Sequence, residues 1–348
     1  AVLGTTSYGD ILKAIREAME GKHFQEFKDI DYLPEKLGKR VLTTGGHFGY
    51  LKIAEGCDKH CTYCIIPKLR GKFRSVPMER LVTQAKEMAE EGVKELILVA
   101  QETTVYGTDI YGKKSLHILL KELCKIKGIR WIRVLYCYPE EIYDELIQTM
   151  KEEKKICHYL DLPIQHASDR ILKRMGRRTT QAELVEIVNK LRREIPDIVL
   201  RTTLISGFPG ETQEDHEELM SFVDEMEFDR LGVFTYSPEE DTPAATMPDQ
   251  VAEEVKEARR DEIMELQQEI SYDKGTDRIG QELLVMIEGK VADESAYIGR
   301  TYGDAPKVDG YIFVQTGELL MTGDFAKVRV TGALEYDLIG ELADEYTE

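Results

Sequence analysis

The strongest constraint on the fold is a six-fold alternation of short apolar runs with longer amphipathic stretches. Continuous apolar runs such as 96–100 are typical of strands buried on both faces of a parallel sheet. Helical stretches between such runs favour parallel strands joined by crossovers. We therefore expect an α/β fold, a partial barrel or an open curved sheet, with strands at 50–54, 96–100, 129–136, 156–162, 198–206 and 230–236.

The predicted helices fill the gaps between these strands. Ser75 and Pro77 open the first, and Gly92 closes it. Further helices are expected at 115–126, 139–150, 168–194 (two stretches), 211–226 and 250–272, with a short one over 11–19 that ends at Gly21. In parallel α/β folds the chemistry gathers at the carboxyl ends of the strands.

The pattern of apolar and polar residues changes after Gly275. Between 281 and 341 the apolar segments shorten, alternate with polar residues and are separated by glycines. This pattern predicts a small five-stranded antiparallel barrel, which we interpret as an appended binding module.

Three cysteines crowd into eight residues directly after the first predicted strand. Cys57, Cys61 and Cys64 have the spacing C-x3-C-x2-C. A closed zinc site and a 4Fe-4S cluster each normally take four ligands, so three thiolates leave one metal position open. A zinc site with His60 as fourth ligand and a loop of free cysteines are the alternatives. The remaining cysteines are interpreted as small buried apolar side chains: Cys124, Cys137 and Cys157.

The composition is that of a globular chain without a membrane segment. No apolar run reaches the roughly 18 residues of a spanning helix, and the N-terminus does not resemble a signal peptide. We therefore expect no membrane partner and a cytoplasmic location. The chain begins at Ala1 without a methionine, which suggests a fragment of a longer protein.

The cysteine spacing, with Tyr63 just before Cys64 and a six-repeat α/β chain around it, is similar to the radical S-adenosylmethionine (SAM) superfamily. The resemblance implies a partial parallel (β/α)6 barrel in which Cys57, Cys61 and Cys64 hold three irons of a 4Fe-4S cluster. It also implies that the fourth iron binds SAM, which one electron splits into methionine and a 5'-deoxyadenosyl radical.

The same resemblance implies SAM contacts at the strand ends. Residues 101–103 occupy the position of the superfamily's contact to the methionine amino group. The segment 205–211 resembles the glycine-containing segment near adenine; the alternative is an ordinary turn in which Glu211 favours the helix N-terminus. The residues expected to contact SAM are Tyr63, Gln101, Glu102, Thr103, Gln165, Arg201, Gly207 and Phe208.

Several short segments are more narrowly similar to the methylthiotransferases, which carry a small C-terminal, OB-like TRAM barrel: 64–67, 70–71, 234–238 and 242–244. The resemblance implies an N-terminal domain remnant and linker at 1–46, a radical SAM domain at 47–275 and a TRAM domain at 276–348. It places a second 4Fe-4S cluster, used for sulfur delivery, in the N-terminal domain of the full-length protein. This sequence has no second cysteine triad, so we expect it to cleave SAM without delivering sulfur.

Two local sequences point to a protein substrate. Residues 165–169 and 299–310 resemble the enzymes that modify an aspartate β-carbon of small-subunit ribosomal protein 12. Residues 279–348 hold five basic and 14 acidic residues, a net charge of −9 in a chain of −19, which suits a basic ribosomal protein and disfavours nucleic acid. The alternatives are a tRNA adenosine methylthiotransferase and a non-enzymatic iron-sulfur or zinc protein. A reductant such as flavodoxin or ferredoxin is expected.

Overall fold

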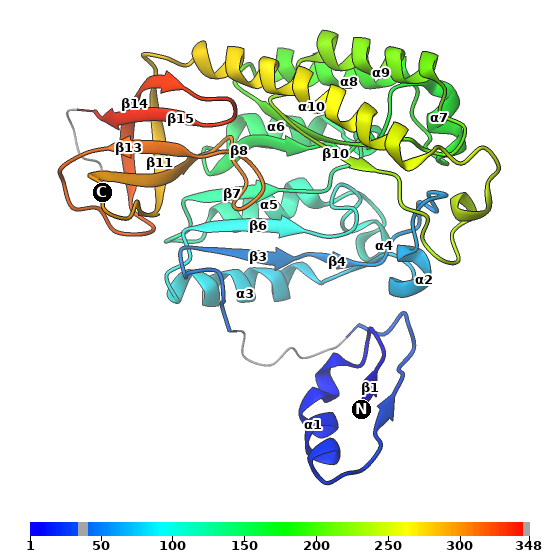
Figure 1. Ribbon diagram of the computed structural model, residues 1–348. Coiled ribbons are helices and arrows are strands. Elements are labelled where there is room, and N and C mark those ends of the chain that lie inside the picture. Colours follow the sequence, from blue (N-terminus) through cyan, green and yellow to red (C-terminus); the bar gives the residue numbers. More distant parts are fainter. Residues whose placement is uncertain (34–40, 344–348) are drawn as a thin grey trace.

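Six parallel strands form one open sheet in the computed structural model, which describes residues 1–33 and 41–343 (Figure 1). Their order is β10-β9-β8-β7-β6-β3, so neighbours in the sheet are also successive in the chain, as helical crossovers favour. All six predicted strands are confirmed, as β3 (Phe48–Lys52), β6 (Glu95–Val99), β7 (Trp131–Val134), β8 (Ile156–Asp161), β9 (Val199–Ser206) and β10 (Arg230–Thr235).

Helices bury one face of this sheet. Leu51, Leu96 and Ile132 of the strands share a large apolar core with Leu81 and Leu119 of the helices. The helices between β3 and the barrel are α2 (Ile66–Arg70), α3 (Met78–Glu90), α4 (Thr108–Tyr111), α5 (Leu116–Cys124), α6 (Asp144–Glu152), α7 (Asp169–Arg174), α8 (Gln181–Glu194), α9 (Gln213–Met226) and α10 (Glu253–Thr276).

The helix predicted over 139–150 begins later than expected. Pro139–Glu141 forms a 3-10 turn (η2), and α6 starts only at Asp144. Ile142 and Tyr143 between them are extended and pack against the core, so tertiary packing overrides the local helical pattern.

The C-terminal part is a closed barrel of five strands with the order β11-β12-β13-β15-β14. Four neighbouring pairs are antiparallel, but β13 and β15 run parallel, so the expectation of a wholly antiparallel barrel is wrong. An odd number of strands cannot close with every neighbour antiparallel, so one parallel pair is unavoidable. The strands are β11 (Glu282–Lys290), β12 (Ala296–Thr301), β13 (Ile312–Gln315), β14 (Phe325–Ala333) and β15 (Leu338–Leu342).

The barrel packs against the sheet on the face that the helices do not cover. Phe48, Trp131 and Tyr159 of the strands form one apolar cluster with Met286 and Phe325 of the barrel. The rings of Trp131 and Phe325 meet edge to face with centroids 4.9 Å apart. The barrel therefore closes one end of the sheet's inner surface.

Residues of the 299–310 segment lie in this interface. Asp304, one of the acidic residues of the negatively charged segment 279–348, is only 2% exposed, and its carboxylate lies 2.6 Å from the Arg230 guanidinium of β10. Asp309 accepts a hydrogen bond from the Tyr159 hydroxyl at 2.7 Å. The segment that resembles the ribosomal-protein enzymes thus joins the barrel to the sheet.

Residues 1–33 form a small unit with a two-stranded parallel sheet and the predicted helix, α1 (Ile11–Met19). It lies beside the end of the sheet that carries α2 and α4 (Figure 1). Asp31 pairs with Arg74 at 3.1 Å, and the Thr5 hydroxyl donates to the Leu69 carbonyl oxygen at 2.8 Å. None of the described helices combines the length and the apolar character needed to cross a membrane.

Candidate active site

The cysteine loop follows β3 and the short strand β4 (Ala54–Glu55). Cys57 and Cys61 are buried, Cys64 is half-buried, and all three are free thiols. The Cys57 N–H donates to the Gly71 carbonyl oxygen at 3.2 Å, which fixes the start of the loop. Burial raises the pKa of Cys57 to about 11 and also raises the pKa of Cys64. A bound metal reverses this preference because it stabilises the thiolate.

The loop borders a cavity of about 570 Å³ at the carboxyl ends of β3, β6 and β7. Its wall includes Cys57, Cys64, Gln101, Tyr136 and Tyr138. This volume lies within the range of roughly 300–1,000 Å³ that is usual for small-molecule and cofactor sites. The carboxyl ends of parallel strands are the expected place for such a site.

Residues 101–103 leave β6 next to this cavity and have three different environments. Gln101 accepts a hydrogen bond from the Gly56 N–H at 2.8 Å and so ties β6 to the cysteine loop. Glu102 is 1% exposed; one carboxylate oxygen accepts from the Thr104 N–H at 2.9 Å, and the other has no partner. The Thr103 hydroxyl donates to the Leu135 carbonyl oxygen at 2.8 Å, so it holds β7.

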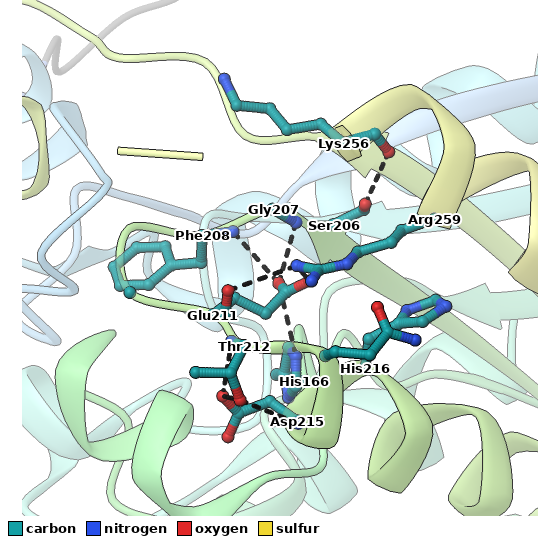
Figure 2. Close-up of polar contacts among 12 residues, drawn as sticks. His166, Ser206, Gly207, Phe208, Glu211, Thr212, Asp215, His216, Lys256 and Arg259 are labelled. Carbon is teal, nitrogen blue, oxygen red and sulfur yellow. Dashed lines mark hydrogen bonds and ion pairs between the residues drawn. The ribbon is translucent and has the colours of Figure 1, made fainter. Parts of the chain in front are cut away.

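The segment 205–211 is built around the Glu211 carboxylate (Figure 2). One of its oxygens accepts from the backbone N–H groups of Gly207 and Phe208 at 2.8 and 3.1 Å, and the other lies 2.8 Å from Arg259 of α10. Burial opposes its charge, but His166 and Arg259 outweigh burial and hold the pKa of Glu211 below its ordinary value.

Glu211 therefore does not stabilise the N-terminus of helix α9, which was the alternative role that the sequence left open. Helix α9 is capped by the Thr212 side chain, which accepts from the Asp215 N–H in a capping box. Glu211 instead points back and shapes the turn that carries Gly207 and Phe208 (Figure 2).

Tyr63 and Phe208, far apart in the sequence, meet in space. Their rings are edge to face with centroids 6.4 Å apart, and both belong to an apolar cluster with Tyr236. The turn after β9 thus reaches the cysteine loop. The Tyr138 hydroxyl lies 3.8 Å from the Cys61 sulfur, and the Arg177 guanidinium lies 4.4 Å from the centroid of the Tyr138 ring.

Gln165 and Arg201 have backbone or ionic partners within the protein. Gln165 follows β8 with a left-handed φ of 71°, and its N–H donates to the Thr203 carbonyl oxygen at 2.9 Å. Arg201 pairs with Asp161 at 2.8 Å and with Asp309 of the C-terminal part at 3.3 Å. Arg201 thus links a strand end to the barrel, and its contact with SAM stays a prediction.

Comparison with known proteins decides the family. Residues 51–223 match the model of the radical SAM superfamily, and residues 279–343 match that of the TRAM domain. A protein of Lachnoclostridium phytofermentans named ribosomal protein uS12 methylthiotransferase RimO is 64% identical over 98% of this chain and 77% of its own length. Proteins of the same name from Clostridium perfringens and Clostridioides difficile are 53% and 48% identical over 99% of the chain.

The chain belongs to the uS12 methylthiotransferase family. The cofactors of its superfamily are a 4Fe-4S cluster and SAM, and the described residues fit both. Two of the three thiols, Cys57 and Cys64, line a cavity of suitable size. Glu102 lines a smaller neighbouring pocket that Cys57 also borders, and its unpaired carboxylate oxygen suits an ammonium group. His60 is exposed, and among residues 1–33 and 41–343 no three His, Cys, Asp or Glu side chains are arranged around a single ion. A cluster differs from a single ion because each thiolate binds its own iron.

Lys52, Tyr136 and Tyr138 are among the cavity residues that the sequence did not predict. Lys52 ends β3, Tyr136 follows β7 with a left-handed φ of 60°, and Tyr138 lies two residues further on. A bulky residue with positive φ is uncommon and costs free energy, so such residues cluster at functional sites. The Tyr136 N–H donates to Asp161 at 3.1 Å, and its carbonyl oxygen accepts from the Thr103 N–H at 3.0 Å. In the sequence, the only indication that Lys52, Tyr136 and Tyr138 belong to the site was their position at the ends of strands.

Proposed function

We propose that the chain serves the methylthiolation of ribosomal protein uS12, in which a hydrogen on the β-carbon of an aspartate is replaced by a methylthio group, and that it carries out the SAM cleavage and hydrogen abstraction of that reaction. The observation that carries this proposal is the match, along 98% of the chain, to a protein named ribosomal protein uS12 methylthiotransferase. The net charge of −9 over residues 279–348 supports it, because tRNA phosphates would be repelled and a basic ribosomal protein attracted.

In this proposal Cys57, Cys61 and Cys64 hold the cluster, and SAM lies in the cavity beside them. When bound, the two cofactors supply the one-electron chemistry that removes a hydrogen atom from the substrate. Burial raises the pKa of Glu102 to about 7, and an ammonium beside its unpaired oxygen would favour the charged carboxylate. Glu102 lines a smaller pocket that shares Cys57 with this cavity, and from there it is suited to hold the methionine end of SAM.

The remaining predicted contacts divide between the two ends of SAM. Gln101, in the cavity wall, would lie toward the methionine end. Phe208, Gly207 and Tyr63 would form the adenine side, because Phe208 and Tyr63 are in contact and Glu211 fixes the turn between β9 and α9. Thr103 and Gln165 would act through the backbone of the strand ends.

We also propose that the exposed acidic surface of the barrel docks uS12 and that flavodoxin or ferredoxin supplies the electron. A substrate that belongs to the ribosome supports a cytoplasmic location. A division into 1–46, 47–275 and 276–348 is supported by the family matches at 51–223 and 279–343.

Hydrogen transfer from the substrate gives a direct test that does not depend on sulfur delivery. The chain is reconstituted anaerobically with iron and sulfide, then incubated with SAM, a reductant and uS12 deuterated at its aspartate β-carbons. Deuterium is expected in the 5'-deoxyadenosine that is released. Transfer from deuterated tRNA adenosine, with none from uS12, would instead support the tRNA alternative.

A further inference from the structure

Lys52 is the one formally charged side chain among the described residues that line the cavity beside the cysteine loop. It is the last residue of β3, and its side chain is 47% exposed. Apart from Gln101 and the two cysteines, the other residues of the cavity wall are aromatic or apolar, among them Tyr50, Val99 and Tyr136. A cation in such a wall marks the place where an anion can be bound.

Lys52 keeps donors for a ligand although it already has a protein partner. Its ammonium pairs with one oxygen of Glu55, three residues further on. An ammonium has three N–H donors, and one carboxylate oxygen takes one of them. Glu55 also lies 3.8 Å from the Arg70 guanidinium, so its charge does not depend on Lys52 alone.

Both molecules that the proposed reaction brings to this cavity carry a carboxylate. SAM has its own ammonium and sulfonium, so its carboxylate arrives with compensating positive charge. The substrate aspartate has no such charge on its side chain, and moving its carboxylate from water into the cavity is costly unless a cation receives it. Lys52, the one cation of the cavity wall, is therefore better matched to the carboxylate of the substrate aspartate than to the carboxylate of SAM.

We propose that Lys52 binds the side-chain carboxylate of the substrate aspartate and thereby sets the position of its β-carbon. This inference rests on the proposed function. The carboxylate carbon is bonded directly to the β-carbon, so an ion pair at Lys52 fixes the reacting atom to within one bond. Such positioning is a large part of how enzymes favour one hydrogen over its neighbours. It makes Lys52 the residue that selects aspartate over asparagine.

A double-substitution cycle tests the pairing. The reconstituted chain with SAM, kept unreduced so that no turnover occurs, is titrated with uS12 and with uS12 whose target aspartate is replaced by asparagine. We expect the unsubstituted chain to prefer the aspartate form by about ten-fold, the factor that a charge-assisted hydrogen bond of about 1.4 kcal/mol provides. In Lys52→Gln the two forms should bind with nearly equal affinity.

Two further variants separate a lost cation from a broken ion pair. Glu55→Gln removes the same Lys52–Glu55 pair but keeps the ammonium, so its preference for aspartate should persist. Lys125→Gln removes a matched lysine, which pairs at 2.6 Å with Glu122 three residues away on α5, and should also leave the preference unchanged.

The remaining outcomes oppose the proposal in distinguishable ways. An undiminished preference in Lys52→Gln overturns the role of Lys52 while leaving the function intact. A fall in SAM affinity in Lys52→Gln, with the aspartate preference retained, assigns Lys52 to the SAM carboxylate instead. If the unsubstituted chain takes no deuterium from uS12, the proposed function itself fails, and the inference fails with it.

Discussion

Arg300 of the barrel and Glu95 of the parallel sheet form an ion pair from which water is excluded. Their nearest nitrogen and oxygen atoms are 2.7 Å apart, and neither side chain has any exposed surface. Arg133 binds the other oxygen of Glu95 at 2.8 Å, and Glu288 binds Arg300 at 2.6 Å. Glu95, Arg133 and Arg300 have no exposed side-chain surface where the barrel and the sheet meet, so the two parts depend on one another.

Removing one partner of this network should be costly. Arg300→Ala leaves Glu95 and Glu288 with fewer positive partners in a buried place, and we expect a loss of roughly 3–5 kcal/mol in the free energy of unfolding. Denaturant unfolding measures it. Lys151→Ala is the control, because its pair with Glu194 is exposed and should contribute about 1 kcal/mol or less. Equal losses in the two variants would contradict the structural role of the buried pair.

The same network predicts an acid dependence. Burial alone would raise the pKa of Glu95, but the pairs with Arg300 and Arg133 outweigh it and hold this pKa below its ordinary value. A depressed carboxyl pKa stabilises the fold above the unfolded-state pKa of about 4.3, and that stability is lost as the pH falls toward the folded-state pKa. Unfolding free energies measured across this window should decline less steeply in Glu95→Gln, and an unchanged slope would argue against the assignment.

Cluster assembly should depend on three of the six cysteines. Cys57→Ala, Cys61→Ala or Cys64→Ala each leaves a second iron without its thiolate, so iron content and SAM cleavage should both be lost. Cys124→Ala should leave both largely intact, because this thiol lies on α5, packed against the core away from the loop. Iron and sulfide analysis and 5'-deoxyadenosine release are the measurements. Comparable losses at all four positions would show that the triad is not the sole ligand set.

Gly207 should not tolerate a side chain. Its φ is 71°, and a Cβ there would lie 2.2 Å from Cγ of Lys256, which is buried in α10. Gly207→Ala should therefore displace the turn that Glu211 holds and raise the SAM concentration needed for half-maximal cleavage. Gly289→Ala is a fitting control, since an added Cβ meets nothing within 4 Å and the residue lies in a barrel strand. SAM binding that is equally unaffected in both variants would show that the turn does not shape the site.

The periodicity of the apolar residues and the spacing of the cysteines predicted the features that depend on local sequence. They did not predict the ion pairs between residues that are far apart in the chain. The strands and the cysteine loop follow from apolar runs and from C-x3-C-x2-C, which are visible in one stretch of chain. Glu95 and Arg300 look like surface residues in the sequence, because only the packed interface shows that each is the partner of the other. Lys52 was missed for a similar reason, since which strand residues face the cavity depends on how the whole sheet is covered.

Docking of uS12 should depend on exposed acidic residues of the barrel and not on every acidic residue in it. Asp293 and Glu294 are exposed between β11 and β12, so replacing both with Lys should slow association and weaken its salt dependence without changing thermal stability. Surface changes of this kind seldom alter stability by more than about 0.5 kcal/mol.

Asp304→Lys should behave differently, because it places a second cation against Arg230 in a buried site and should lower the melting temperature markedly. Stopped-flow association with uS12 at two salt concentrations, together with thermal unfolding, distinguishes the two classes. Association that is unaffected in the double variant would move the docking surface away from the β11–β12 loop.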